Sequence, residues 1–113
     1  MPFQADEWGR DPSVRRMREI FSSMEKAQGE LLGRIAIFPF DPRLRPVRRK
    51  ALESFERVWA LSARKGVVLG EEEVTSLYLL CLVDGLVSEG IHVPPKLLTT
   101  NERLNDLFKQ GLS

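Results

Sequence analysis

The chain has 113 residues, 42% of them hydrophobic and 29% charged, with a formal net charge of +1, a balance typical of one soluble globular domain. One cysteine excludes an intramolecular disulfide, and one cysteine with one histidine is too few for the three or four ligands of a typical zinc site. No run approaches the roughly 20 apolar residues of a membrane span, and residues 1–12 lack the pattern of a secretory signal, so we expect a cytoplasmic protein without membrane contact.

The first predicted helix begins after an N-terminal arm. Residues 1–10 carry Phe3 and Trp8 without periodicity and form this arm, whereas residues 11–113 form the helical domain. Asp11 is a good helix cap and Pro12 suits the first helical position, so a helix is predicted from residue 12. Apolar residues then recur at spacings of three and four, interrupted only by Gln28: Val14, Met17, Phe21, Met24, Leu31, Ile35 and Phe38.

The end of this helix has two interpretations. The apolar spacing favours helix to about residue 37, whereas a short strand over 34–38 is the alternative. Gly29 and Gly33 each weaken a helix by about 1 kcal/mol, and their spacing is weak evidence for close helix packing. Three prolines within residues 39–46 predict a loop, with the next helix beginning at Pro42 or Pro46.

A helical hairpin is predicted over 46–89. Its first helix, about 46–65, has an apolar pattern that includes Leu52, Phe55 and Trp59, which we assign to the core. This helix ends where Gly66 can adopt a left-handed cap, with Val67 as the hydrophobic contact after it. Three acidic residues at 71–73 suit the first turn of the next helix, about 71–89.

The helix at 71–89 is the most apolar part of the chain, which predicts burial on most sides. A β-hairpin turning at Asp84-Gly85 is a weaker alternative, because the flanking residues do not alternate. Gly90 and Ile91 repeat the predicted cap chemistry, and a capping box at 99–102 predicts a last helix at about 100–110. The predicted fold is an all-α, single-domain bundle of about four helices; its alternative adds a small strand at 34–38 or 67–69.

The near-neutral net charge hides an asymmetry along the chain. Residues 1–70 hold 14 basic and 9 acidic residues, a net charge of +5, whereas residues 71–113 hold 3 and 7, a net charge of −4. Such a division indicates association, either between the two halves or with a charged partner. Antiparallel self-association is the simplest arrangement in which each half of the chain meets a region of opposite charge.

A basic segment is the first candidate binding site. Its five residues lie within eight positions that contain no acid: Arg43, Arg45, Arg48, Arg49 and Lys50. The plain interpretation is a solvated helix start; the functional ones are an acidic protein partner or, less favoured, a nucleic acid bound through its phosphates. A dedicated nucleic-acid module usually has a more basic domain and a recognisable motif.

The apolar spacing of the first helix is the candidate for self-association. Its residues would line a contact in which the polar position helps to set the register: Val14, Met17, Phe21, Met24, Gln28 and Leu31. The plain interpretation is that the same residues form the core of one copy. Phe38 and Phe40, in the proline-rich loop, are expected to cover the ends of the core, and an interface is the alternative.

No catalytic, metal or cofactor site is recognisable. The acidic residues at 71–73 are adjacent and project about 100° apart, so they suit the helix dipole better than one metal ion. Cys81 lies in the apolar run, where burial makes a thiol inert, and His92 lies at a turn. We therefore expect a non-enzymatic helical protein–protein interaction module, self-associating or part of a larger assembly, with nucleic-acid association as the alternative.

Overall fold

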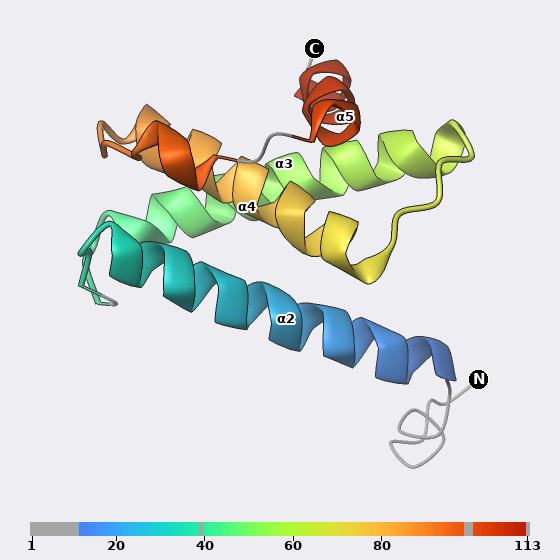
Figure 1. The fold of residues 1–113 in the computed structure, drawn as a ribbon, viewed down its shortest axis with the longest axis horizontal. Helices are drawn as coiled ribbons and strands as arrows, with labels where there is room; N and C mark the ends of the chain where they lie inside the picture. The colour runs from blue at the N-terminus through green and yellow to red at the C-terminus, as the bar shows by residue number, and fades with distance from the viewer. Residues whose placement is uncertain (1–11, 39, 99–100, 113) are drawn as a thin grey trace.

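Four α-helices and one short 3-10 helix make up the regular structure of the residues that the structure describes. The computed structural model describes residues 12–38, 40–98 and 101–112, with side chains from Arg18 onward. The elements are α2 (Pro12–Arg34), α3 (Leu44–Arg64), α4 (Glu71–Ser88), η1 (Pro95–Leu97) and α5 (Glu102–Leu112) (Figure 1). The all-α prediction is confirmed, and the strands considered at 34–38 and 67–69 are absent. The predicted arm, residues 1–10, lies outside the described part of the chain.

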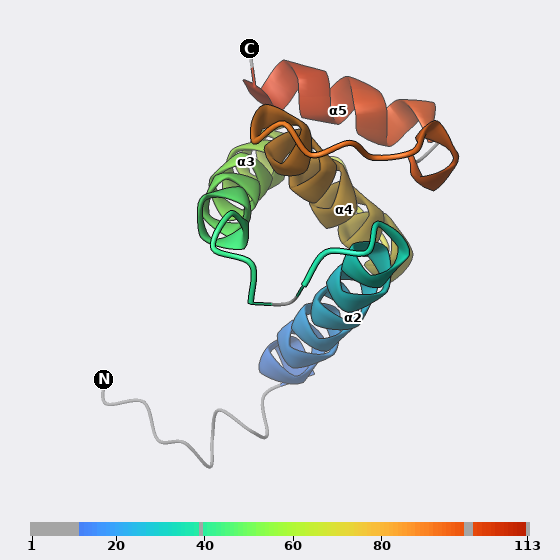
Figure 2. The same cartoon turned by 90° about the vertical axis from the view of Figure 1, so that its left-hand side faces the viewer.

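Helix α4 is the centre of the bundle. It contacts α2, α3 and α5, and its most buried side chains are almost fully excluded from solvent: Val74, Leu77, Cys81, Leu82 and Leu86. Helix α5 lies across α3 and α4 on the side opposite α2 (Figures 1 and 2). A helix that is apolar around most of its circumference needs partners on most sides, and α4 has them.

The hairpin of α3 and α4 ends its helices as predicted. Gly66 and Gly90 have φ of 68° and 78°, the left-handed conformation that costs glycine little. The N–H groups of Val67 and Ile91 donate to the carbonyls of Ser62 and Leu86, which completes a Schellman cap at each end. The β-hairpin alternative at 84–85 is wrong, because both residues are helical.

Helix α2 ends at Arg34, three residues before the expected end. The N–H of Ala36 donates to the carbonyl of Gly33, and the N–H of Ile37 donates to that of Leu32. This is the same Schellman arrangement, with alanine at φ 57° where glycine is usual. Residues 35–38 are therefore neither helix nor strand. The predicted continuation to residue 37 failed because no glycine marks the cap.

Helix α3 begins at Leu44, earlier than Pro46 and later than Pro42. The carboxylate of Asp41 accepts hydrogen bonds from the backbone N–H of Arg43 at 2.9 Å and from its guanidinium at 2.7 Å. The backbone carbonyl of Asp41 accepts from the N–H of Leu44 at 3.0 Å. Pro46 then lies in the first turn, where a missing N–H leaves no helical bond unmade.

Close approach of helices depends on two glycines other than the pair at 29 and 33. A Cβ at Gly85 would lie 2.9 Å from the carbonyl oxygen of Val47, and one at Gly111 would lie 2.6 Å from a methyl of Val58. No atom would lie within 4 Å of a Cβ at Gly29 or Gly33. The predicted close packing at 29–33 is therefore wrong. The close helix contacts are instead those of α3 with α4, at Gly85, and of α3 with α5, at Gly111.

Helix α5 begins at Glu102, two residues after the predicted start at about residue 100. The side-chain oxygen of Asn101 accepts from the N–H of Leu104 at 3.2 Å, so Asn101 caps the helix. The threonines of the predicted capping box lie outside the described residues. Within the described part of the chain, no helix is both long and apolar enough to cross a membrane.

Candidate functional site

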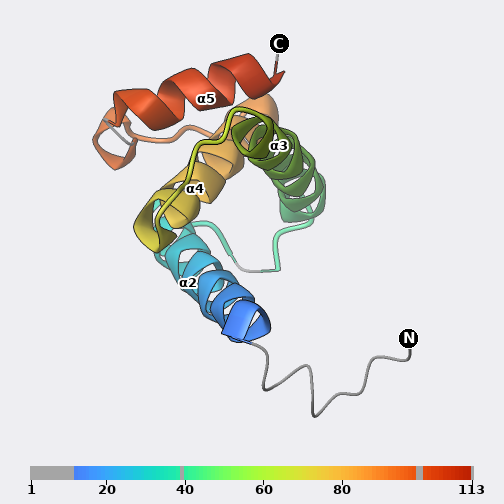
Figure 3. The same cartoon turned by 90° about the vertical axis from the view of Figure 1, so that its right-hand side faces the viewer.

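A hollow opens between α2 and α3, over α4. Neither helix covers the other: α2 packs mainly on α4, whereas α3 packs on α4 and α5, and Figures 2 and 3 show α2 and α3 set apart. The end of the hollow nearer the start of α3 has a volume of about 440 Å³. Its lining combines apolar, polar and charged side chains: Phe21, Met24, Glu25, Gln28, Arg48, Leu52 and Tyr78.

The hollow continues toward the C-terminal end of α3. This second part has a volume of about 320 Å³ and shares Phe21 and Met24 with the first. Its lining is entirely apolar or aromatic: Ile20, Phe21, Met24, Phe55, Trp59 and Val74. We call the two parts together the α2–α3 hollow. An apolar floor with a few polar groups at one end is the usual character of a binding surface.

A hydrogen bond fixes the polar end of the hollow. The Tyr78 hydroxyl on α4 donates to the side-chain carbonyl of Gln28 on α2 at 2.5 Å. Burial raises the pKa of Tyr78 above its ordinary value, and the nearby Arg48 partly opposes that rise. The phenol is therefore neutral at physiological pH and acts as a donor. Its ring stands edge-on to Phe55, which in turn stacks on Trp59 at 5.8 Å between ring centres.

Three large apolar side chains around the hollow remain open to solvent. Phe21 is 50% exposed, Leu52 is 47% exposed and Trp59 is 44% exposed. They come from α2 and α3 and line the hollow from both sides. Single exposed apolar residues are ordinary, but a group of them around one hollow is typical of an interaction surface.

The predicted self-association residues divide between core and surface. Met24 and Leu31 are buried in the core of one copy. Gln28 is half-buried and bonded to Tyr78, so it acts within the chain. Among the predicted self-association residues whose side chains are described, Phe21 is the one that is exposed. Val14 and Met17 belong to α2, but their side chains lie outside the described part.

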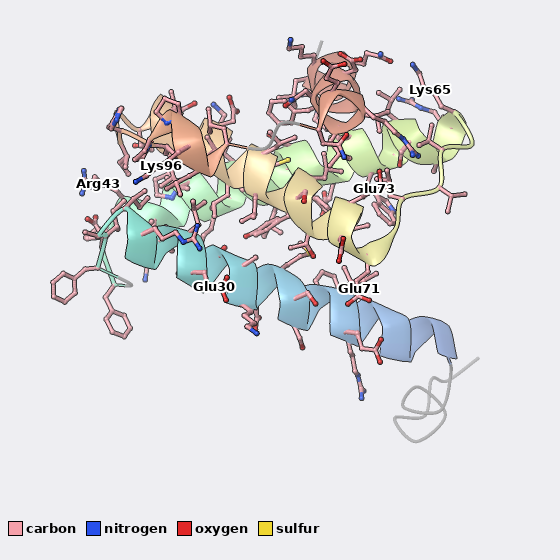
Figure 4. The ribbon with its side chains drawn as sticks, in the orientation of Figure 1. Glu30, Arg43, Lys65, Glu71, Glu73 and Lys96 are labelled. Atoms are coloured by element: carbon pink, nitrogen blue, oxygen red, sulfur yellow. The ribbon has the colours of Figure 1, made fainter. Side chains whose placement is uncertain are left out.

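The predicted basic segment is partly occupied by contacts within the chain. Arg43 pairs with Asp41 at 2.7 Å, and this hydrogen-bonded pairing lowers the pKa of Asp41. Figure 4 shows Arg43 on the loop beyond α2, far from Glu71 at the start of α4. Lys50 donates to the hydroxyl of Ser88 at 2.6 Å and lies 3.9 Å from Asp84. Both cations are therefore engaged.

The other basic residues of this segment point outward. Arg45, Arg48 and Arg49 are exposed, and no ion pair or hydrogen bond of their side chains occurs among the described residues. Arg48 also lines the α2–α3 hollow beside Phe21 and Leu52. The structure thus brings one residue of the basic candidate site together with residues of the self-association candidate site.

Two features of the hollow were missed by sequence reasoning. Leu52 and Trp59 were assigned to the core, but they lie on the exposed side of α3. The buried positions of α3 form a separate stripe: Leu44, Val47, Ala51, Ser54, Val58 and Ser62. The sequence did carry a sign of this second, exposed group of apolar residues: the apolar pattern of the helix is wider than the single stripe that packing against one neighbour requires.

Phe38 and Phe40 do not cover the core. They are 78% and 91% exposed in the loop between α2 and α3, so that expectation is wrong. Neither lines the α2–α3 hollow. Pro39 between them lies outside the described residues.

The remaining reactive side chains form no site within the described residues. Burial raises the pKa of the Cys81 thiol to about 12, which suppresses its thiolate. His92 is exposed in the connection after α4. Glu73 accepts from the backbone N–H of Gly70 at the start of α4, and Glu71 accepts from Ser23 at 3.2 Å. No group of three or more potential metal ligands occurs in the described ranges.

Comparison of the chain with protein-family models, with curated proteins and with solved structures gave no match.

Proposed function

We propose that the chain is a non-enzymatic protein–protein interaction module that acts in the cytoplasm, as a homodimer or as a small subunit of a larger assembly. The α2–α3 hollow is its contact surface. The observation that carries the proposal is the exposure of Phe21, Leu52 and Trp59 around one apolar hollow. Contact residues of this kind release free energy when a partner removes them from water.

The composition of the hollow suits a protein partner. Aromatic and arginine side chains contribute most to binding at protein interfaces, and Trp59, Phe21 and Arg48 are of these types. The floor is held by the packed core and by the bond between Gln28 and Tyr78. A floor that is already ordered lowers the entropy that binding must overcome.

Site-specific photo-crosslinking in cells that express the full chain tests this proposal. A benzophenone-bearing amino acid replaces Leu52 in one variant. In the control it replaces Val68, which is 82% exposed and does not line the hollow. We expect one discrete adduct from position 52 and none of that mass from position 68. Its mass separates a second copy from another protein. Absence of an adduct from position 52 would contradict the proposal.

Nucleic-acid association is the second candidate, and its support is narrower. Only Arg45, Arg48 and Arg49 of the basic segment lack an ion pair or hydrogen bond among the described residues. Each phosphate contact would make binding weaken as salt rises. A fluorescence titration with single- and double-stranded DNA and RNA at about 50 mM salt tests it. Binding that falls with salt and with Arg49→Glu would support it, and no binding would exclude it.

A further inference from the structure

A self-complementary stripe runs along the exposed side of α3. It consists of Arg45, Arg48, Leu52, Glu56 and Trp59, which follow one another at helical spacings of three and four. All five are exposed. We call it the α3 stripe. Its cations lie in the first half of the helix, its acid and aromatic lie in the second half, and Leu52 lies between them.

We infer that the α3 stripe binds the α3 stripe of a second copy, with the two helices antiparallel about a two-fold axis at Leu52. This inference rests on the proposed function and names the partner. In that register Arg48 faces Glu56 of the other copy, and Leu52 faces its counterpart. Arg45 faces the other Trp59, a favourable placement of a guanidinium on an aromatic ring. Each contact occurs twice, as a two-fold interface requires.

The charges favour this orientation over the parallel one. Parallel helices would bring the arginines of both copies together, which is repulsive, whereas antiparallel helices pair them with acids. Neither Arg48 nor Glu56 has an ion-pair partner within the described residues. Both are therefore available to a second copy.

The apolar residues place the pairing beside the α2–α3 hollow. Leu52 and Trp59 belong both to the α3 stripe and to the lining of the hollow. Phe21 of α2 stands across the hollow from them and is half-exposed. A second α3 on the stripe would remove these apolar side chains from water. The two Leu52 side chains would meet at the centre, and each Trp59 would lie at one end of the pairing, beyond an Arg48–Glu56 contact.

Sedimentation equilibrium of charge-reversed variants tests the pairing. Each single reversal, Arg48→Glu or Glu56→Arg, turns both symmetric pairs into like-charge contacts. We expect each to weaken dimerisation about tenfold or more, and the double reversal to restore the dimer to within about threefold. Glu53→Arg is the control, because it makes the same charge change off the stripe and should leave the dimer unaffected. Circular dichroism checks that each variant is folded.

The outcomes separate this inference from the proposed function. A dimer that both single reversals weaken and the double reversal restores supports the antiparallel pairing. A dimer that the double reversal does not restore, or a chain that stays monomeric to about 1 mM, overturns it. In either of those cases an adduct from position 52 still supports an interaction through the α2–α3 hollow, and its absence overturns the proposed function as well.

Discussion

The hydroxyl of Tyr78 on α4 donates a hydrogen bond to the side chain of Gln28 on α2 at 2.5 Å. Gln28 is the one polar residue in the apolar pattern of α2, a pattern that by itself indicates a contact between copies. The bond gives that residue a partner within the chain. Met24 and Leu31, on the same side of the helix, are buried as well. This part of α2 belongs to the core, and only its margin at Phe21 is exposed.

The bond between Gln28 and Tyr78 should show as a coupling energy. In a double-mutant cycle with Gln28→Leu and Tyr78→Phe, we expect each single change to destabilise the fold by about 1 kcal/mol, and the double change to cost less than their sum. Urea denaturation measures it. Ser23 and Glu71 also join α2 to α4, but their bond is exposed, so their cycle should give a coupling near zero. Equal couplings in the two cycles would contradict this account.

Alanine should lower the stability of the fold at the tightly packed glycines and raise it at an exposed one. Gly85→Ala and Gly111→Ala would each drive a methyl into α3, and we expect a loss of about 1–3 kcal/mol, despite the better helix propensity of alanine. Gly29→Ala meets no atom within 4 Å in an exposed part of α2, so it should stabilise by up to about 1 kcal/mol. Thermal unfolding compares the three. A stabilising Gly85→Ala would show that the approach of α4 to Val47 is not tight.

Replacing Ala36, at the end of α2, with glycine should stabilise the fold. Ala36 has φ of 57°, a conformation that costs an L-residue about 1–2 kcal/mol and costs glycine little. We expect Ala36→Gly to stabilise the fold by up to about 1 kcal/mol, less than the strain because glycine is also freer when unfolded. Ala63→Gly, within the last turn of α3, is the matched control and should destabilise. Chemical denaturation of both variants checks the sign.

The Cys81 thiol should make the fold lose stability in alkali. Burial raises its pKa from 9.0 to about 12, so the folded chain holds a proton that the unfolded chain loses. The contribution is fully present below pH 9 and is lost as pH rises toward 12. Tyr78, with its raised pKa, acts in the same direction. Urea denaturation between pH 8 and pH 10.5 should therefore show falling stability, with a shallower fall for Cys81→Ala.

Thiol reactivity gives an independent check on that environment. At pH 8 the native chain should react with a disulfide reagent far more slowly than the urea-unfolded chain, because Cys81 is buried and protonated. A native rate equal to the unfolded rate would contradict the burial and, with it, the expected pH dependence.

The fold was predictable where the local chemistry of the chain and its packing agree. Gly66 and Gly90 mark their helix ends because glycine adopts the left-handed cap at little cost. The apolar residues around most of the circumference of α4 identify it as the central helix. The end of α2 was not predictable, since Ala36 makes the same cap without the residue that signals it. The start of α3 depends on Asp41 turning back on Arg43, and proline positions alone do not reveal this.

The candidate site was only partly predictable, for a physical reason. A single sequence shows that a helix has apolar residues but not which neighbour covers them. Leu52 and Trp59 fit a core pattern and yet face the hollow, because α2 packs on α4 and leaves that side of α3 uncovered. The charge division between 1–70 and 71–113 pointed to antiparallel association. In the pairing that we infer, the complementary charges instead come from the two halves of a single helix, α3.

The most direct test of the central claim, that a second copy covers the exposed side of α3, is the fluorescence of Trp59. A Trp8→Phe chain leaves Trp59 as its only tryptophan. If the second copy covers it, emission should move to shorter wavelength and iodide quenching should fall as the concentration rises from about 1 μM to 1 mM, and Leu52→Asp should abolish both changes. Emission and quenching that are identical at all concentrations would contradict the claim.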